Sequence, residues 1–183
     1  FGDLGVLFIL IVILVYIVMA TQFESLLFPF IIMFTIPFAF TGVFLALWMT
    51  STPLSLIALI GAIMLVGIVT KNGIVMVDYM NLLVERGSGV FDAVIAGGKS
   101  RLRPVLMTSF TTILGMLPLA IGTGAGSETW QPMGIAVIGG LTCSTLLTLF
   151  IIPALYSVFV NRSQRKEKEK LARLSAEHQA SVH

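Results

Sequence analysis

Charged side chains are scarce in this sequence, and their scarcity excludes an ordinary soluble domain. Asp, Glu, Lys and Arg make up 11% of the 183 residues, whereas 57% are hydrophobic; soluble domains contain about 25% charged residues. No such residue occurs between Glu24 and Lys71, or between Glu128 and Arg162. Each gap can hold one or two helices of the ~20 residues that cross a bilayer. We therefore expect an integral membrane protein.

Cysteine and histidine are scarcer still, which narrows the chemistry open to the chain. Cys143 is the sole cysteine of the sequence, so no internal disulfide can form. His178 and His183 have no partners at the spacing of metal ligands. The sequence contains no Gly-rich phosphate loop and no Ser/His/Asp arrangement that spacing supports. We expect no metal site, no enzyme activity, no bound cofactor and no nucleic-acid partner.

Five apolar segments are present instead, and they predict an all-α membrane protein with a bundle of about five transmembrane helices in residues 1–160. The predicted helices cover residues 4–20, 28–49, 54–83, 104–121 and 133–160. Residues 85–103 form a polar connection, in which residues 91–96 suggest a short helix along the membrane surface. The chain opens at Phe1 without a methionine or the basic region of a signal peptide, so we expect it to be a fragment of a larger protein.

The basic residues are concentrated in two regions, and these set the expected orientation. Four of the eleven lie in residues 86–103, between the third and fourth spans, and six lie in residues 162–173. With five spans both regions share one face of the membrane, and the preference of Lys and Arg for cytoplasmic loops makes that face cytoplasmic. Residues 161–183 are then a basic cytoplasmic tail, which we expect to be disordered and able to touch anionic membrane lipid.

The remaining basic residue, Lys71, lies inside the third apolar segment. An unpaired ammonium near the bilayer centre costs at least ~2.5–3.5 kcal/mol, so we expect Lys71 to face the bundle interior and meet a carboxylate or a hydrated path. The alternative is that its long side chain extends to an interface. Asp78 shares its helical face but lies ~10 Å along the axis, which makes it a secondary candidate only. We expect the opposing carboxylate to come from a part of the protein outside this sequence.

A second polar stripe marks the fourth span. Arg101, Thr108 and Gly115 recur every seven residues and therefore share a helical face. Arg101 could instead be a positive anchor at the start of its helix, and Thr108 could bond its own backbone. Small residues within the spans are expected at helix contacts, and those singled out are Gly61, Gly67, Gly115 and Gly140.

Five stretches follow one another along the chain: VTKNGIVMVDYMN from Val69, KSRLRPVLMTS from Lys99, TILGMLPLAIGTGAG from Thr112, WQPMGIAVIGG from Trp130 and LFIIPALYSVF from Leu149. In this order and spacing they resemble the carboxy-terminal membrane half of resistance-nodulation-division (RND) efflux permeases of the AcrB-type multidrug subgroup. The resemblance extends over nearly the whole chain up to Val160. It implies that the five segments correspond to spans eight to twelve of a twelve-helix transporter.

The same resemblance implies proton-driven export across the bacterial inner membrane, with the proton gradient in place of a cofactor. It matches the family's proton-relay lysine, arginine and threonine to Lys71, Arg101 and Thr108. In the family these residues face two aspartates on span four, in the N-terminal half that is missing here. Because the heavy-metal subgroup usually lacks the lysine, the implied substrates are drugs or other amphiphilic organic compounds. The alternatives are a lipid or envelope-component exporter and an inactive truncated module. The resemblance also implies a homotrimer with a periplasmic adaptor and an outer-membrane channel.

Overall fold

The computed structural model describes residues 2–23 and 26–181, and its regular structure there is helical. The helices are α1 (Gly2–Phe23), α2 (Leu27–Met33), α3 (Thr35–Met49), α4 (Leu56–Glu85), α5 (Val90–Ile121) and α6 (Ser127–Ser181). With α2 and α3 taken together, five candidate spans in the described residues are long and apolar enough to cross a membrane. The predicted all-α bundle of about five transmembrane helices is confirmed. Phe1, Glu24 and His183 lie outside the described residues.

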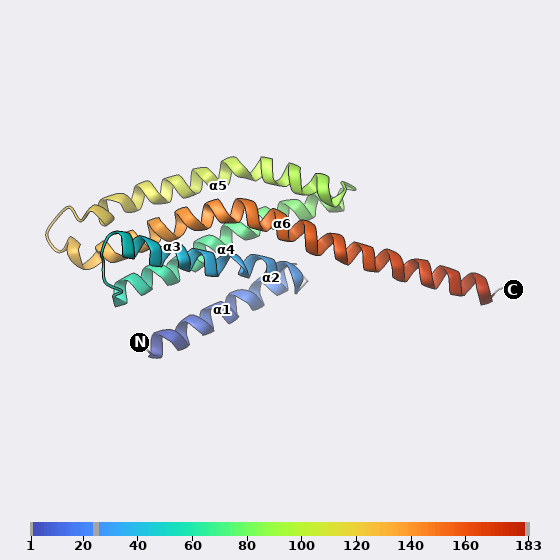
Figure 1. Ribbon diagram of the computed structural model, residues 1–183, viewed down its shortest axis with the longest axis horizontal. Helices are drawn as coiled ribbons and strands as arrows, with labels where there is room; N and C mark the ends of the chain where they lie inside the picture. Colours follow the sequence, from blue (N-terminus) through green and yellow to red (C-terminus); the bar gives the residue numbers. More distant parts are fainter. Residues whose placement is uncertain (1, 24–25, 182–183) are drawn as a thin grey trace.

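Helix α6 is the centre of the bundle. Helices α3, α4 and α5 pack along its membrane part, whereas α1 lies at one edge, next to α2 (Figure 1). One cluster of buried apolar side chains includes Val43, Leu65 and Leu141, and a second includes Met80 and Tyr156. Of the described residues of α1, only Met19 is buried. The core therefore lies along α6: α3 and α4 complete the first cluster, and α4, α2 and Met19 of α1 complete the second.

Glycines allow α3 and α6 to approach closely. A Cβ atom added to Gly42 would lie 2.5 Å from Cβ of Cys143 and 2.8 Å from the carbonyl oxygen of Gly139. A Cβ atom on Gly140 would collide with the Leu65 side chain. Real Cβ atoms do not make such contacts, so larger residues here would force the helices apart.

The four glycines predicted at helix contacts divide into two pairs. Gly61 backs onto Met133, with 3.0 Å between its added Cβ and the Met133 Cγ, and Gly140 lies at the contact of α6 with α3 and α4. Gly67 and Gly115 have no described atom within 4 Å of an added Cβ. The structure therefore places two of the four at helix contacts and leaves two facing open space.

The second span differs from its prediction because it is built from two helices. α2 ends at Met33 and α3 begins at Thr35. Pro37 explains the break, since a proline cannot donate a hydrogen bond to the carbonyl four residues earlier and its ring clashes with that carbonyl, here that of Met33. The Thr35 hydroxyl donates to the carbonyl oxygen of Ile32 at 2.6 Å, which stabilises the irregular turn.

Helix α5 begins at Val90 rather than at residue 104, which corrects the prediction of a separate surface helix over residues 91–96. Pro104 lies inside the helix and removes one backbone hydrogen bond. Ala93 and Gly97 are nevertheless buried, and a Cβ atom on Gly97 would lie 2.7 Å from Cγ of Met80. Packing against α4 therefore outweighs the local cost of the proline. Arg101 consequently lies inside α5 and not at its start.

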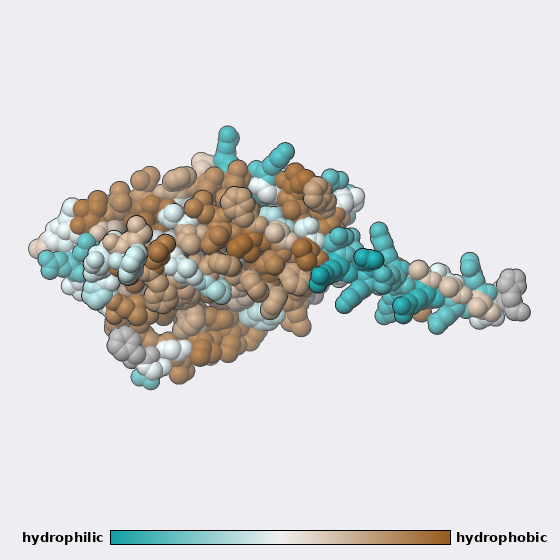
Figure 2. All heavy atoms as spheres, in the orientation of Figure 1, coloured by the Kyte–Doolittle hydropathy of each residue, from teal (hydrophilic) through white to brown (hydrophobic). Residues whose placement is uncertain are grey.

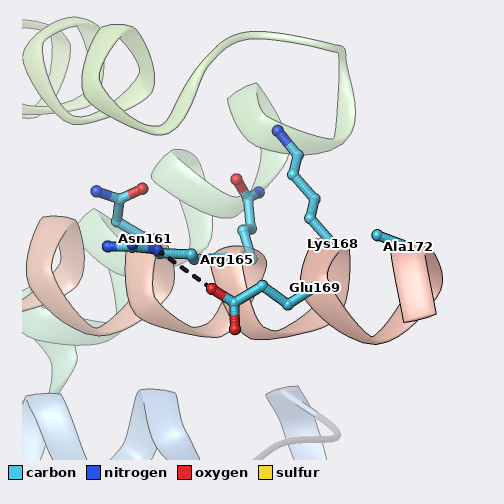
Figure 3. A pocket seen from close by; sticks show the side chains of 6 residues that line it. Asn161, Arg165, Lys168, Glu169 and Ala172 are labelled. Carbon is cyan, nitrogen blue, oxygen red and sulfur yellow. Dashed lines mark ion pairs between the residues drawn. The ribbon is translucent and has the colours of Figure 1, made fainter.

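Helix α6 continues through residues 161–181, where the sequence predicts disorder. This extension is hydrophilic and projects beyond the apolar bundle (Figure 2). It is rich in Lys, Glu, Ala, Arg and Leu, which are strong helix formers. Arg165 Nε and Glu169 Oε1 form an i,i+4 ion pair at 3.6 Å, while Lys168 points away (Figure 3). Such exposed pairs contribute about 0.3–0.5 kcal/mol, so helix propensity accounts for most of the order.

Tyr156 fastens α6 to α4 within the second core cluster. Its hydroxyl donates a hydrogen bond to Oδ1 of Asn81 at 2.6 Å, and its ring stacks on Phe28 with centroids 5.8 Å apart. The side chain is fully buried. Because loss of the Tyr156 hydroxyl leaves the partly buried Asn81 oxygen without this donor, the bond should contribute measurably to stability.

Replacing Tyr156 by Phe should therefore destabilise the protein by about 1 kcal/mol, and Asn81→Leu should cost less in the Phe background than in the wild type. Thermal unfolding in detergent, followed by the loss of helical circular dichroism, measures both. Tyr16→Phe is the matched control, since that hydroxyl bonds the Leu26 carbonyl at 3.0 Å in an exposed position. Equal shifts for Tyr16→Phe and Tyr156→Phe would contradict the assignment.

Candidate functional site

One face of α4 is left uncovered by the other described helices. Its exposed residues recur at helical spacing and form one line along the helix, here called the open face of α4: Ile60, Met64, Gly67, Lys71, Asp78 and Leu82. The opposite side of α4 is packed, with Leu65, Met76 and Met80 almost fully buried. A bilayer-spanning helix thus presents two ionisable side chains away from its own bundle.

Lys71 lies on this open face. The sequence predicts that it faces the bundle interior, but the described helices do not enclose it. Among the described residues, the one ion pair is that between Arg165 and Glu169, and Lys71 forms none. Asp78 does not pair with it, because seven residues of helix separate the two by ~10 Å along the axis. Within the described chain, the cation has no acidic counterpart.

The contact between Arg101 and Tyr79 shows how α5 is aligned along α4. Its guanidinium carbon lies 4.7 Å from the centroid of the Tyr79 ring. The two helices pack against each other and run antiparallel (Figure 1). With a rise of ~1.5 Å per residue, Thr108, seven residues beyond Arg101, reaches nearly the depth of Lys71, eight residues before Tyr79. The structure thus brings the three predicted relay residues onto two adjacent helices.

Thr108 and Gly115 lie on the exposed side of α5. The Thr108 hydroxyl donates to the carbonyl oxygen of Pro104 at 3.0 Å, the local bond that the sequence analysis left open as an alternative. A hydroxyl that donates in this way still has lone pairs to accept a hydrogen bond. On the next residue, the Ser109 hydroxyl lies 2.8 Å from that of Thr145 and ties α5 to α6. Thr108 therefore remains available on the exposed side.

These residues place a cation, a guanidinium and a hydroxyl on two neighbouring helices. The described part of the chain supplies a fixed cation at Lys71, a guanidinium at Arg101 and a hydroxyl at Thr108, all of which stabilise or bind an anion. No described carboxylate forms an ion pair with Lys71. The described helices thus leave Lys71 on the open face without an acidic partner.

Sequence reasoning missed Tyr79. The residue follows Asp78 directly and carries no charge, so its signal was weak. Its contact with Arg101 depends on how α4 and α5 are rotated about their axes, which residue spacing alone does not determine. An aromatic residue close to the level of an intramembrane arginine was the available clue.

Comparison with known proteins identifies the family. The model of the AcrB/AcrD/AcrF family matches residues 2–160. Multidrug resistance protein MdtC of Erwinia tasmaniensis is 44% identical over 156 residues, which cover 84% of this chain and 15% of the relative. MdtC of Yersinia enterocolitica is 44% identical over 161 residues, covering 87% of this chain and 16% of the relative.

A solved structure agrees with these sequence matches. The X-ray crystal structure of a heavy metal efflux pump superposes with a TM-score of 0.77 at 32% identity, covering 86% of this chain and 15% of that chain. The chain thus spans only 15–16% of the length of the relatives named above. A match over most of the chain, by sequence and by structure, shows that it belongs to the AcrB/AcrD/AcrF family of RND efflux permeases.

Proposed function

We propose that this chain is the membrane part of a proton-driven efflux transporter for drugs or other amphiphilic organic compounds, and that it supplies half of the proton relay. The observation that carries the proposal is Lys71, a cation on an otherwise largely apolar helix face with no acidic partner among the described residues. At a cost of at least ~2.5–3.5 kcal/mol, a bilayer-spanning helix retains such a residue for function and with a partner.

The partner is a carboxylate on a helix from another segment of the same permease, packed against the open face of α4. In the ionised state this carboxylate pairs with Lys71, and the attraction is strong because the surroundings have a low dielectric constant. Proton uptake neutralises the carboxylate and releases Lys71, which shifts the preferred packing of the two helix groups. That change in packing is the step at which the proton gradient does mechanical work.

Arg101 and Thr108 adjust this exchange. A guanidinium near the carboxylate favours its ionised form and so lowers its proton affinity. The Thr108 hydroxyl accepts a hydrogen bond from water on the exposed side of α5, at nearly the depth of Lys71. Both residues lie on the helix next to α4, so a single movement of the facing helix changes their distance from the acid together.

Organic compounds are the proposed substrates because of Lys71 and the similarity pattern. The relatives that share 44% identity are named multidrug resistance proteins, whereas the heavy metal efflux pump shares 32%. The basic residues support a cytoplasmic position for the extension of α6. Membership of the family supports a location of the spans in the bacterial inner membrane. We further propose assembly as a homotrimer with a periplasmic adaptor and an outer-membrane channel.

The test measures export by the complete permease that contains this sequence, expressed in cells that lack their own such pumps. We expect lower accumulation of an amphiphilic fluorescent dye, several-fold higher accumulation after a protonophore is added, and unchanged tolerance of silver, copper and zinc salts. The vector without the gene is the control. Dye export that persists after the gradient collapses while ATP is maintained would contradict proton coupling, and metal tolerance without dye export would contradict the substrate class.

A further inference from the structure

The Arg101 side chain contacts an aromatic ring and no acidic group among the described residues, and the proposed relay does not explain this arrangement. Its Nε atom is buried and has no hydrogen-bond partner among the described residues. Its guanidinium carbon lies 4.7 Å from the centroid of the half-buried Tyr79 ring. No described carboxylate forms an ion pair with it, although Asp78 precedes Tyr79 directly. Among the described residues, the Tyr79 ring is thus the one ionic, hydrogen-bonding or aromatic partner of this guanidinium.

An aromatic partner leaves the cation in a different state from an acidic one. A carboxylate would neutralise the guanidinium and occupy two of its N–H groups in a bidentate pair. A ring attracts the cation through its quadrupole, covers one side of the guanidinium plane, and leaves the N–H groups at the edge free to donate. Tyr79 therefore holds the guanidinium in place without neutralising its charge or occupying its N–H groups.

Without the Tyr79 ring, the Arg101 side chain could extend toward water instead. Arg101 lies about three helical turns from the start of α5 at Val90. It belongs to the polar first part of the helix, just before the charge-free segment that begins at Pro104. Long arginine side chains extend toward water when nothing holds them at depth. Loss of the Tyr79 ring would thus let the guanidinium swing away from the open face of α4.

We propose that Tyr79 is a positioning residue for Arg101: its ring fixes the guanidinium, charged and with free N–H groups, beside the open face of α4 for an acid arriving on the facing helix. This inference rests on the proposed function, because the arriving acid is the carboxylate of the proposed relay. The ring's π face performs the role, so a phenyl ring without the hydroxyl should suffice.

The first test varies the ring in the complete permease and measures proton-coupled dye export. Tyr79→Phe should keep the wild-type rate, while Tyr79→Leu should lower the maximal rate several-fold at an unchanged KM for the dye. Phenylalanines carrying one, two or three ring fluorines at position 79 weaken the π face with little change in volume. The maximal rate should fall stepwise along this series. A flat series at equal expression would overturn the proposal, since a packing role depends on volume alone.

The second test reads the position of Arg101 directly and does not depend on transport. An arginine-specific dicarbonyl reagent is applied to membrane vesicles, and modification of Arg101 is measured by peptide mass spectrometry. We expect slow modification in the wild type and Tyr79→Phe, and several-fold faster modification in Tyr79→Leu. Arg103, which is exposed, is the internal control and should react equally in all three. Equal rates at Arg101 would overturn the inference.

The two tests separate this inference from the proposed function. If wild-type export proves independent of the proton gradient, the proposed function fails, and the modification rates still decide whether Tyr79 holds Arg101. If wild-type export is proton-coupled but the fluorinated series is flat or the modification rates are equal, the positioning role fails alone.

Discussion

Lys71→Ala should abolish proton-coupled export by the complete permease while leaving its expression and folding largely intact. In the proposed relay, the substitution removes the cation that pairs with the ionised carboxylate, so uptake of a proton would no longer change the electrostatic attraction between the helices. If the coupling is worth even the ~2.5–3.5 kcal/mol at stake for one intramembrane charge, its loss reduces transport by about 100-fold or more. Minimum inhibitory concentrations of amphiphilic drugs and dye export from preloaded cells measure the effect.

Folding should survive because Lys71 makes no contact that holds the described bundle together. It lies on the open face of α4, and the buried residues of that helix are on the other side. Lys166→Ala is the matched control: it removes the same side chain from the exposed extension of α6, outside the bilayer, and should leave export unchanged. Retained drug resistance in Lys71→Ala at normal expression would exclude the assigned role.

Gly140→Val should prevent α6 from packing correctly against α3 and α4. Its Cβ would collide with the Leu65 side chain, and would lie 2.7 Å from Cγ2 of Val43 and 3.2 Å from the carbonyl oxygen of Ala39. Overpacking typically costs about 1–3 kcal/mol, and a value near 3 is expected here because one of the opposing atoms belongs to the backbone. Thermal unfolding in detergent and the yield of folded protein measure the loss.

Gly98→Val provides the comparison for this substitution. Gly98 also lies inside a helix, α5, but no described atom lies within 4 Å of a Cβ added there. Its replacement should change stability by only a few tenths of a kcal/mol, in line with helix propensity. If Gly98→Val destabilised the protein as much as Gly140→Val, close helix packing would not be the cause.

The membrane class and the number of spans were predictable because the cost of burying charge acts on each residue locally. The charge-free stretches before Lys71 and after Glu128 therefore indicated bilayer helices without any knowledge of contacts. The break between α2 and α3 was also encoded locally, by Pro37, but hydrophobicity alone treats residues 28–49 as one segment. The number of spans thus follows from hydrophobicity, whereas the number of helices also depends on the position of proline.

The parts that could not be predicted depend on how helices rotate and pack. α5 starts at Val90 because Gly97 packs against Met80, a contact that a window of local sequence does not contain. The Tyr156–Asn81 bond joins residues 75 positions apart, and the ring that holds Arg101 is likewise on another helix. For the candidate site, sequence identified the charged and hydroxyl groups, and the structure was needed to find the aromatic group beside one of them.

The length of α6 has a practical consequence for observing motion. Its last twenty or so residues continue one unbroken helix for about 30 Å past the membrane part. A tilt of about 10° in the bilayer displaces the tip of a rod of that length by about 5 Å. The displacement of a spin label or fluorophore at Ser175 in the complete permease would therefore report any change in the tilt of α6 from the water side of the membrane.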